Sequence, residues 1–177
     1  YKRQVLDYAV LVISGADGIQ GHTRTIWRLL EAYGVPVFIF VNKMDQPGTD
    51  KVRLQKELST VLSESCIVFD REEKDLQQFY EDLAVCDEEA LEEYMEKGCV
   101  SQETISWLIR ERKVFPCYYG AALKMEGVQT LLDGLQSYTE ERVCGKKNDG
   151  QSKESFGARV FKITRDPHGN RLSHMRV

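Results

Sequence analysis

The order of strand and helix patterns near the start of the chain constrains its fold more than any other feature. Residues 5–13 form a short apolar run rich in branched side chains, and small and polar residues at 14–18 interrupt it. Apolar residues at 26, 29, 30 and 33 then follow with the spacing of one helix face, and Gly34 ends that pattern. Residues 35–41 are apolar again. The sequence therefore predicts a buried strand, a helix and a second buried strand, which together form one unit of a parallel sheet.

The middle of the chain continues this α/β pattern. We expect residues 50–113 to form a helical insert, with stripes of apolar residues at 54, 58, 61 and 62 and at 91, 94 and 95. Residues 114–119 return to a strand pattern that Gly120 ends, and residues 128–138 predict another amphipathic helix. The predicted fold class is α/β, a parallel sheet with flanking helices and a helical insert.

The end of the chain has a different character. Residues 144–156 are polar and predict a flexible linker. Strand patterns over residues 156–163 and 171–177 follow, with turn-forming residues at 166–170 between them. Because two strands do not form a stable domain alone, we expect residues 157–177 to begin a second, β-rich domain after a first domain at residues 1–143.

Charge and hydropathy exclude several classes of protein. The 24 Lys and Arg against 28 Asp and Glu leave a net charge of −4, which argues against a protein that coats nucleic acid. Residues 71–112 hold 13 Asp and Glu against 5 Lys and Arg. Such a segment is usually a solvated helix face, and the alternative is a docking surface for a basic protein. The apolar runs are far shorter than a membrane span, so no membrane partner is expected.

The cysteines also limit the possible chemistry. They stand at positions 66, 86, 99, 117 and 144 without a C-x-x-C pair. Neither a zinc site nor a disulfide framework is predicted, and a reducing, cytoplasmic location is expected.

The residues that carry chemistry follow the second predicted strand, in the order Asn42-Lys43-Met44-Asp45. Ligands of open α/β sheets bind at the carboxyl ends of the strands. Guanine offers two adjacent donors, N1–H and the 2-amino group, and one carboxylate such as Asp45 can accept both. Adenine would leave that carboxylate unpaired. The Lys43 stem can lie against the flat base, and the Asn42 amide can hold the base edge or the neighbouring loop.

A second segment is expected to reach the same edge of the sheet. Gly120-Ala121-Ala122-Leu123 follows the strand at residues 114–119, and its small residues would let backbone N–H groups approach a base oxygen such as guanine O6. Each segment alone is also compatible with an ordinary turn after a strand. Together they predict a guanine-binding site formed by Asn42, Lys43, Asp45, Ala121, Ala122 and Leu123.

Residues 5–50 resemble the guanine-nucleotide domain of elongation factor G and its relatives. The resemblance lies in residues 5–12, 17–20 and 23–27 and in the stretch from Val35-Pro36 to Asp45. Residues 157–163 resemble the first strand of the β-barrel domain that follows in this family, and the insert is matched poorly. The chain looks closest to the tetracycline-resistance ribosomal protection proteins, with elongation factor G itself and bacterial peptide chain release factor three as alternatives.

The resemblance implies part of a P-loop-NTPase-type sheet and a GTPase of translation that works on the ribosome in the cytoplasm. Its cofactors would be GTP or GDP, with Mg²⁺ in the intact protein. For a ribosomal protection protein, the biological effect would be antibiotic resistance. Asn42, Lys43 and Asp45 match the family's guanine-specificity motif, and Ala121-Ala122-Leu123 match the next base-contacting motif, which is Ser-Ala-Lys in many GTPases. Ala121 stands in place of the usual Ser. Leu123 stands at the Lys position, as an apolar residue often does in elongation factor G.

The motif that holds phosphate in such GTPases, G-x-x-x-x-G-K-[ST], does not occur in the 177 residues, and neither does the family's Asp-x-Pro-Gly-His segment. In the family both precede the position of Tyr1. We therefore expect an internal fragment that holds no catalytic residue and no Mg²⁺ ligand, that exposes the sheet edge near residues 5–13, and that does not hydrolyse GTP alone. The alternative is a non-catalytic interaction module with a degenerate guanine-nucleotide fold.

Overall fold

The computed structural model describes residues 6–70, 75–139 and 159–176 and divides into two units. The larger unit is Asp7–Thr139, and the other contains the hairpin near the end of the chain. Val5, the predicted linker at 144–156 and the first residues of the next predicted strand, 156–158, lie outside the described residues.

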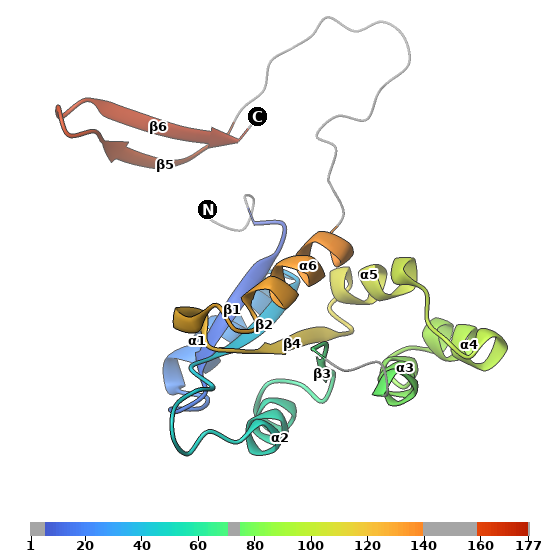
Figure 1. Ribbon diagram of the computed structural model, residues 1–177. Coiled ribbons are helices and arrows are strands. Elements are labelled where there is room, and N and C mark those ends of the chain that lie inside the picture. Colours follow the sequence, from blue (N-terminus) through green and yellow to red (C-terminus); the bar gives the residue numbers. More distant parts are fainter. Residues whose placement is uncertain (1–5, 71–74, 140–158, 177) are drawn as a thin grey trace, which may run out of the picture. The chain divides into compact units, whose positions relative to one another are not determined.

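The larger unit is built on a four-stranded parallel sheet with the order β1-β2-β4-β3 (Figure 1). β1 and β2 pair along their whole length, from Ala9↔Val37 to Ser14↔Asn42. The strands are β1 (Ala9–Ser14), β2 (Val37–Asn42), β3 (Cys66–Val68) and β4 (Phe115–Tyr119). The predicted α/β fold with a parallel sheet is confirmed.

Helices connect these strands, and several begin at residues that satisfy their free N–H groups. Asp50 accepts hydrogen bonds from the backbone N–H groups of Val52 and Arg53, and the Ser101 hydroxyl accepts one from Thr104. The helices are α1 (Gly21–Ala32), α2 (Lys51–Val61), α3 (Leu76–Ala84), α4 (Glu88–Lys97), α5 (Gln102–Arg110) and α6 (Val128–Tyr138), with a short 3₁₀ helix η3 (Ala122–Lys124). None of the described helices has the length and apolar character that a bilayer span requires.

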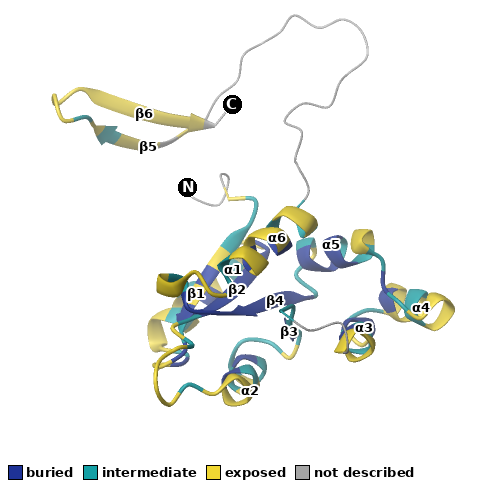
Figure 2. Cartoon of the chain, in the orientation of Figure 1, coloured by how far each residue is buried: buried dark blue, intermediate teal, exposed yellow. Residues whose placement is uncertain are grey.

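Helices cover both faces of the sheet, and β2 shows how (Figure 2). Val37, Ile39 and Val41 pack on one side with Trp27 of α1 and with Leu54 and Leu58 of α2, whereas Phe38 and Phe40 pack on the other side with residues of α3, α4, α5 and α6. Every residue of β2 before Asn42 is buried. A strand that is covered on both faces is continuously apolar, which is the pattern that residues 35–41 display.

Strand β3 is the main departure from the predicted fold, because it interrupts the helical insert expected at residues 50–113. Its three residues pair with β4, from Cys66↔Phe115 to Val68↔Cys117. An apolar run this short has no measurable period, so the sequence pattern could not separate it from the helices around it. β3 is therefore a strand of the sheet, and α2 before it packs on the sheet through Leu54 and Leu58.

The helix faces also differ in part from the predicted stripes. Leu91 and Met95 of α4 are 45% and 77% exposed, whereas Ala90 is fully buried. In α1, Trp27 is buried and Leu29 is exposed, as is Tyr33 directly after the helix. The spacing located both helices correctly, but the buried side of each is set by what fits against its neighbour, such as a small alanine at the contact between α3 and α4.

Strand β1 lies at one edge of the sheet, and its burial alternates. Leu11 and Ile13 are buried, whereas Val10 and Val12 are exposed. The strand begins at Ala9 rather than at residue 5, and among the described residues it pairs only with β2. The prediction of an exposed edge near this strand agrees with the structure, and the buried strand expected here is buried on one of its faces.

The second unit contains an antiparallel hairpin of β5 (Arg159–Arg165) and β6 (Arg171–Arg176). Asp166 closes the turn, because its carboxylate accepts hydrogen bonds from the backbone N–H groups of His168 and Asn170 at 2.9 and 2.8 Å. Gly169 has φ 86°, which a glycine adopts easily. The predicted hairpin and its turn are therefore present.

Candidate base-binding site

The two segments singled out in the sequence lie next to each other at the carboxyl edge of the sheet. β2 and β4 are neighbouring strands, with Val41 opposite Tyr119. Beyond the strands, the N–H of Gly120 donates to the carbonyl of Val41, and the N–H of Met44 donates to the carbonyl of Gly120, both at 3.0 Å. The loop that holds Asn42–Asp45 and the loop that holds Ala121–Leu123 are thus joined by backbone hydrogen bonds.

Asn42 joins the two loops through its side chain. Its Oδ1 accepts hydrogen bonds from the backbone N–H of Lys43 at 2.8 Å and from the backbone N–H of Ala122 at 2.9 Å. The Asn42 amide therefore holds the neighbouring loop, which is one of the two roles expected for it. This contact brings predicted residues from both segments into a direct interaction.

The loop after β2 has an unusual but well supported backbone. Lys43 has φ 64°, a left-handed conformation that a non-glycine residue rarely adopts. The N–H of Gln46 donates to the carbonyl of Lys43, and the Thr49 hydroxyl donates to the carbonyl of Met44 at 2.8 Å. On the other side, the N–H of Gly15 donates to the carbonyl of Asn42 at 2.7 Å. Left-handed residues held in this way are concentrated at functional sites.

The loop after β4 closes on itself. Ala121 and Glu126 exchange backbone hydrogen bonds of 3.0 and 3.2 Å, which form a small ring from residue 121 to residue 126. A Cβ atom at Gly120 would lie 2.2 Å from the carbonyl oxygen of Glu126, and one at Gly127 would lie 2.2 Å from that of Tyr119. Gly120 is therefore required by the close approach of the chain itself.

The remaining predicted residues are placed differently from one another. Ala121 is buried, Ala122 is half-buried, and Leu123 is 97% exposed. Leu123 thus presents a free apolar side chain beside the joined loops, and Lys43 is also exposed. Such surfaces can cover the flat face of an aromatic ring.

The carboxylate of Asp45 has a partner that the sequence pattern did not single out. The Lys124 ammonium lies 3.1 Å from Oδ2 of Asp45, and this contact raises the pKa of Lys124. Lys124 is the residue after Leu123 and the last residue of η3. The sequence could have indicated this ion pair, because Lys124 directly follows the second predicted segment and that segment was expected to lie beside Asp45.

The donors and acceptors at this edge fit a nucleobase. A carboxylate, a carboxamide and backbone N–H groups can bind the polar edge of a base, and aliphatic side chains can bind its face. Among the described residues, no three His, Cys, Asp or Glu side chains lie close enough together to hold a metal ion.

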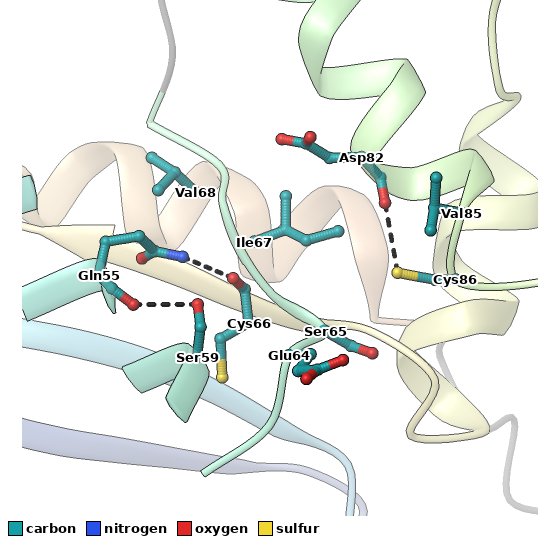
Figure 3. Close-up of a pocket in the computed structure, with 10 residues that line it drawn as sticks. All are labelled: Gln55, Ser59, Glu64, Ser65, Cys66, Ile67, Val68, Asp82, Val85 and Cys86. Atoms are coloured by element: carbon teal, nitrogen blue, oxygen red, sulfur yellow. Dashed lines mark hydrogen bonds between the residues drawn. The ribbon is translucent and has the colours of Figure 1, made fainter. Parts of the chain in front are cut away.

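A cavity of about 520 Å³ lies elsewhere, between α2, β3 and α3 (Figure 3). The Gln55 amide that lines it donates to the carbonyl of Cys66 at 2.6 Å, and the Cys86 thiol donates to the carbonyl of Asp82 at 3.3 Å. Burial raises the pKa of the Cys86 thiol, which makes it a weak nucleophile. None of the predicted base-site residues lines this cavity, and these two polar side chains are paired within the protein.

Comparison with known proteins shows the family and the fold. The elongation factor Tu GTP binding domain family matches residues 2–141. A crystal structure of a protein from Thermus thermophilus is similar, with a TM-score of 0.76 and 19% sequence identity, over 98% of this chain and 32% of that chain. At that identity the likeness concerns the fold alone, and this chain spans about a third of that protein. The family match extends over most of the sequence, and the chain therefore belongs to the elongation factor Tu GTP-binding domain family.

Proposed function

We propose that this chain supplies the guanine-recognition part of the nucleotide site of a translational GTPase. The observation that carries the proposal is the hydrogen bond from the Ala122 N–H to Asn42 Oδ1. It places the loop that ends in Asp45 beside the loop that carries Leu123, as a base bound between them would require. Family membership supplies the class of ligand, since its members are described as GTP-binding domains.

Each residue has a distinct role in this proposal. Asp45 accepts the N1–H and the 2-amino group of guanine, which adenine cannot offer. The N–H groups of Ala121 and Ala122 already donate to the carbonyl of Glu126 and to Oδ1 of Asn42, so the N–H of Leu123 is the one we propose for the base oxygen. The Lys43 stem and the Leu123 side chain cover the base faces. Asn42 keeps the two loops in register. In the whole protein, the reacting group would be the terminal phosphate of the bound nucleotide.

For the whole protein we propose GTP hydrolysis on the ribosome, in the cytoplasm. The 177 residues contain no phosphate-binding motif of the G-x-x-x-x-G-K-[ST] type, so hydrolysis by this chain alone is not expected. Nucleotide affinity should be low as well, because phosphate contacts supply much of the charge-assisted binding in such sites.

Within the family, we propose a ribosomal protection protein that confers tetracycline resistance. The support is the resemblance of residues 5–50 and 157–163. Elongation factor G, a release-factor-three-like GTPase and a non-catalytic module are the alternatives. Expression of the full-length protein in a tetracycline-sensitive bacterium should raise the tetracycline concentration that stops growth. Unchanged sensitivity, with the protein present on ribosomes, would favour a translocation or release factor.

Base recognition can be tested by titration with GDP and ADP, followed by amide NMR shifts so that millimolar affinities are measurable. GDP should shift the amides of Lys43 and Ala122, and ADP should not. Asp45→Asn should reverse the preference between GDP and xanthosine diphosphate, because xanthine has an oxygen in place of the 2-amino group. Equal binding of GDP and ADP, or shifts away from these loops, would contradict the proposal.

A further inference from the structure

We propose that Lys124 is a positioning residue of the base site, which holds the Asp45 carboxylate in the orientation that guanine needs. The proposal deepens the function proposed above and rests on it. The sequence motifs named Asn42, Lys43 and Asp45 on one loop and Ala121, Ala122 and Leu123 on the other. They assigned nothing to the lysine that follows.

The geometry of the pair leaves room for the base. Lys124 Nζ lies 3.1 Å from Oδ2 of Asp45, which is the carboxylate oxygen that this ion pair uses. Each carboxylate oxygen has two lone pairs, so Oδ2 can keep its lysine and still accept from one guanine N–H while Oδ1 accepts from the other. The lysine and the base can therefore bind the same carboxylate together.

The backbone of Lys124 is held firmly, although its side chain reaches solvent. Its N–H donates to the carbonyl of Ala121 at 2.9 Å, and Met125 after it has φ 61°. The mutual hydrogen bonds of Ala121 and Glu126 enclose this turn. The ammonium thus extends from a closed ring that the Asn42–Ala122 hydrogen bond fastens to the loop of Asp45.

Charge favours the same role. Asp45, and to a smaller extent Glu126, raise the pKa of Lys124, which keeps this side chain charged. Without Lys124, Asp45 would have no cation paired with it among the described residues and would be free to turn toward water. Positioning of this kind improves binding by reducing the ordering that the base must impose on the site.

The test compares Lys124→Met with Lys97→Met in the full chain. Lys97 is a matched control, because its exposed ammonium also pairs with a carboxylate, that of Glu93 at 2.9 Å, but on α4. Lys124 is 54% exposed and Lys97 60%, so neither variant should unfold the protein. Lys124→Met should weaken GDP binding about fivefold, the upper range for an exposed ion pair, whereas Lys97→Met should leave it unchanged.

Two further measurements separate positioning from a general loss of structure. Lys124→Arg should restore GDP affinity, because the guanidinium can reach the same carboxylate. In the Asp45→Asn background, Lys124→Met should no longer affect GDP binding, since the carboxylate it positions is gone. A Lys124→Met variant that binds GDP like the wild type, or that loses binding equally in both backgrounds, overturns the proposal. If the wild-type chain binds no guanine nucleotide, the proposed function fails instead.

Discussion

The side chain of Asn42 and the backbone N–H of Ala122, 80 residues apart in sequence, form a 2.9 Å hydrogen bond at the carboxyl edge of the sheet. Oδ1 of Asn42 also accepts from the N–H of Lys43, which starts the turn that carries Asp45. This amide oxygen therefore adds a side-chain link to the backbone hydrogen bonds that join the loops after β2 and β4. Any ligand that contacts both loops depends on this oxygen even without touching it.

Removing that oxygen should loosen the site. Asn42→Ala leaves the Ala122 N–H without its acceptor, so the free energy of unfolding should fall by about 1–2 kcal/mol. The Ala122 amide should also exchange its hydrogen about tenfold faster by NMR, because the loop then opens more often. Asn42→Asp is the control, because its carboxylate can accept from the same N–H groups. Equal exchange rates in all three proteins would mean that the loop is held by its other bonds.

A methyl group at Gly120 should be more damaging than its small size suggests. Gly120→Ala would place Cβ 2.2 Å from the carbonyl oxygen of Glu126, so the backbone must move. We expect a loss of more than about 2 kcal/mol in urea unfolding, beyond the usual effect of a surface substitution. Gly21→Ala, at a glycine with no atom within 4 Å of the added Cβ, should have little effect or be slightly stabilising. Similar stability of the two variants would contradict the close approach.

Glu93 should make the insert sensitive to acid. The Thr104 hydroxyl donates to Glu93 at 2.6 Å and, with Lys97 and Ser101, lowers the pKa of Glu93 from its usual 4.5 to about 2. Because the folded-state pKa is depressed, this stabilisation is complete above about pH 4.5 and is lost as the pH falls toward 2.

Urea unfolding at about pH 6 and about pH 3 tests this prediction. The wild type should lose about 1–2 kcal/mol more between the two pH values than Glu93→Gln, which cannot titrate. Comparison of the two proteins removes the contribution of the other carboxylates. The same pH dependence in both would show that the Glu93 contacts do not stabilise the fold.

Arg112 should contribute to stability through shape as well as charge. Its guanidinium donates to the carbonyl of Val35 and lies 5.5 Å from the ring centroid of Trp27 and 5.1 Å from that of Phe115. Arg112→Lys keeps the charge but loses the planar group, so a loss of about 1 kcal/mol is expected. Arg53→Lys on the exposed side of α2 is the control. Thermal unfolding monitored by tryptophan fluorescence should separate the two, and equal midpoints would contradict the prediction.

The sequence predicted most of the fold because the patterns of β1, α1, β2 and β4 are long or bounded by clear signals. Gly34 follows the end of α1 with φ 61°, as expected. The sequence did not predict strand β3, because the conformation of its three residues depends on pairing with β4. The exposed Leu91 and the buried Ala90 show the same limit, since hydrophobicity does not say which side of a helix has a neighbour.

The sequence likewise predicts some features of the candidate site and not others. The placement of Asn42 and Ala122 at one edge follows from the rule that parallel strands end on the same side. The ion pair of Asp45 with Lys124 does not follow from any spacing, because it depends on how the ring from Ala121 to Glu126 is closed. A glycine is required at position 120 because the backbone of Glu126 lies so close, and the close approach of a ligand is not needed to explain it.

The central place of β4 in the sheet has a consequence for folding during synthesis. β1, α1 and β2 are consecutive, so they can pair as soon as they leave the ribosome. β3 has no strand to pair with until β4 arrives and inserts between it and β2. Until then β2 presents an open edge and Asn42 has no second loop to hold. A translation pause before residue 115 would therefore prolong an intermediate in which β2 has an open edge, and the joined loops after β2 and β4 would mark chains that have passed this point.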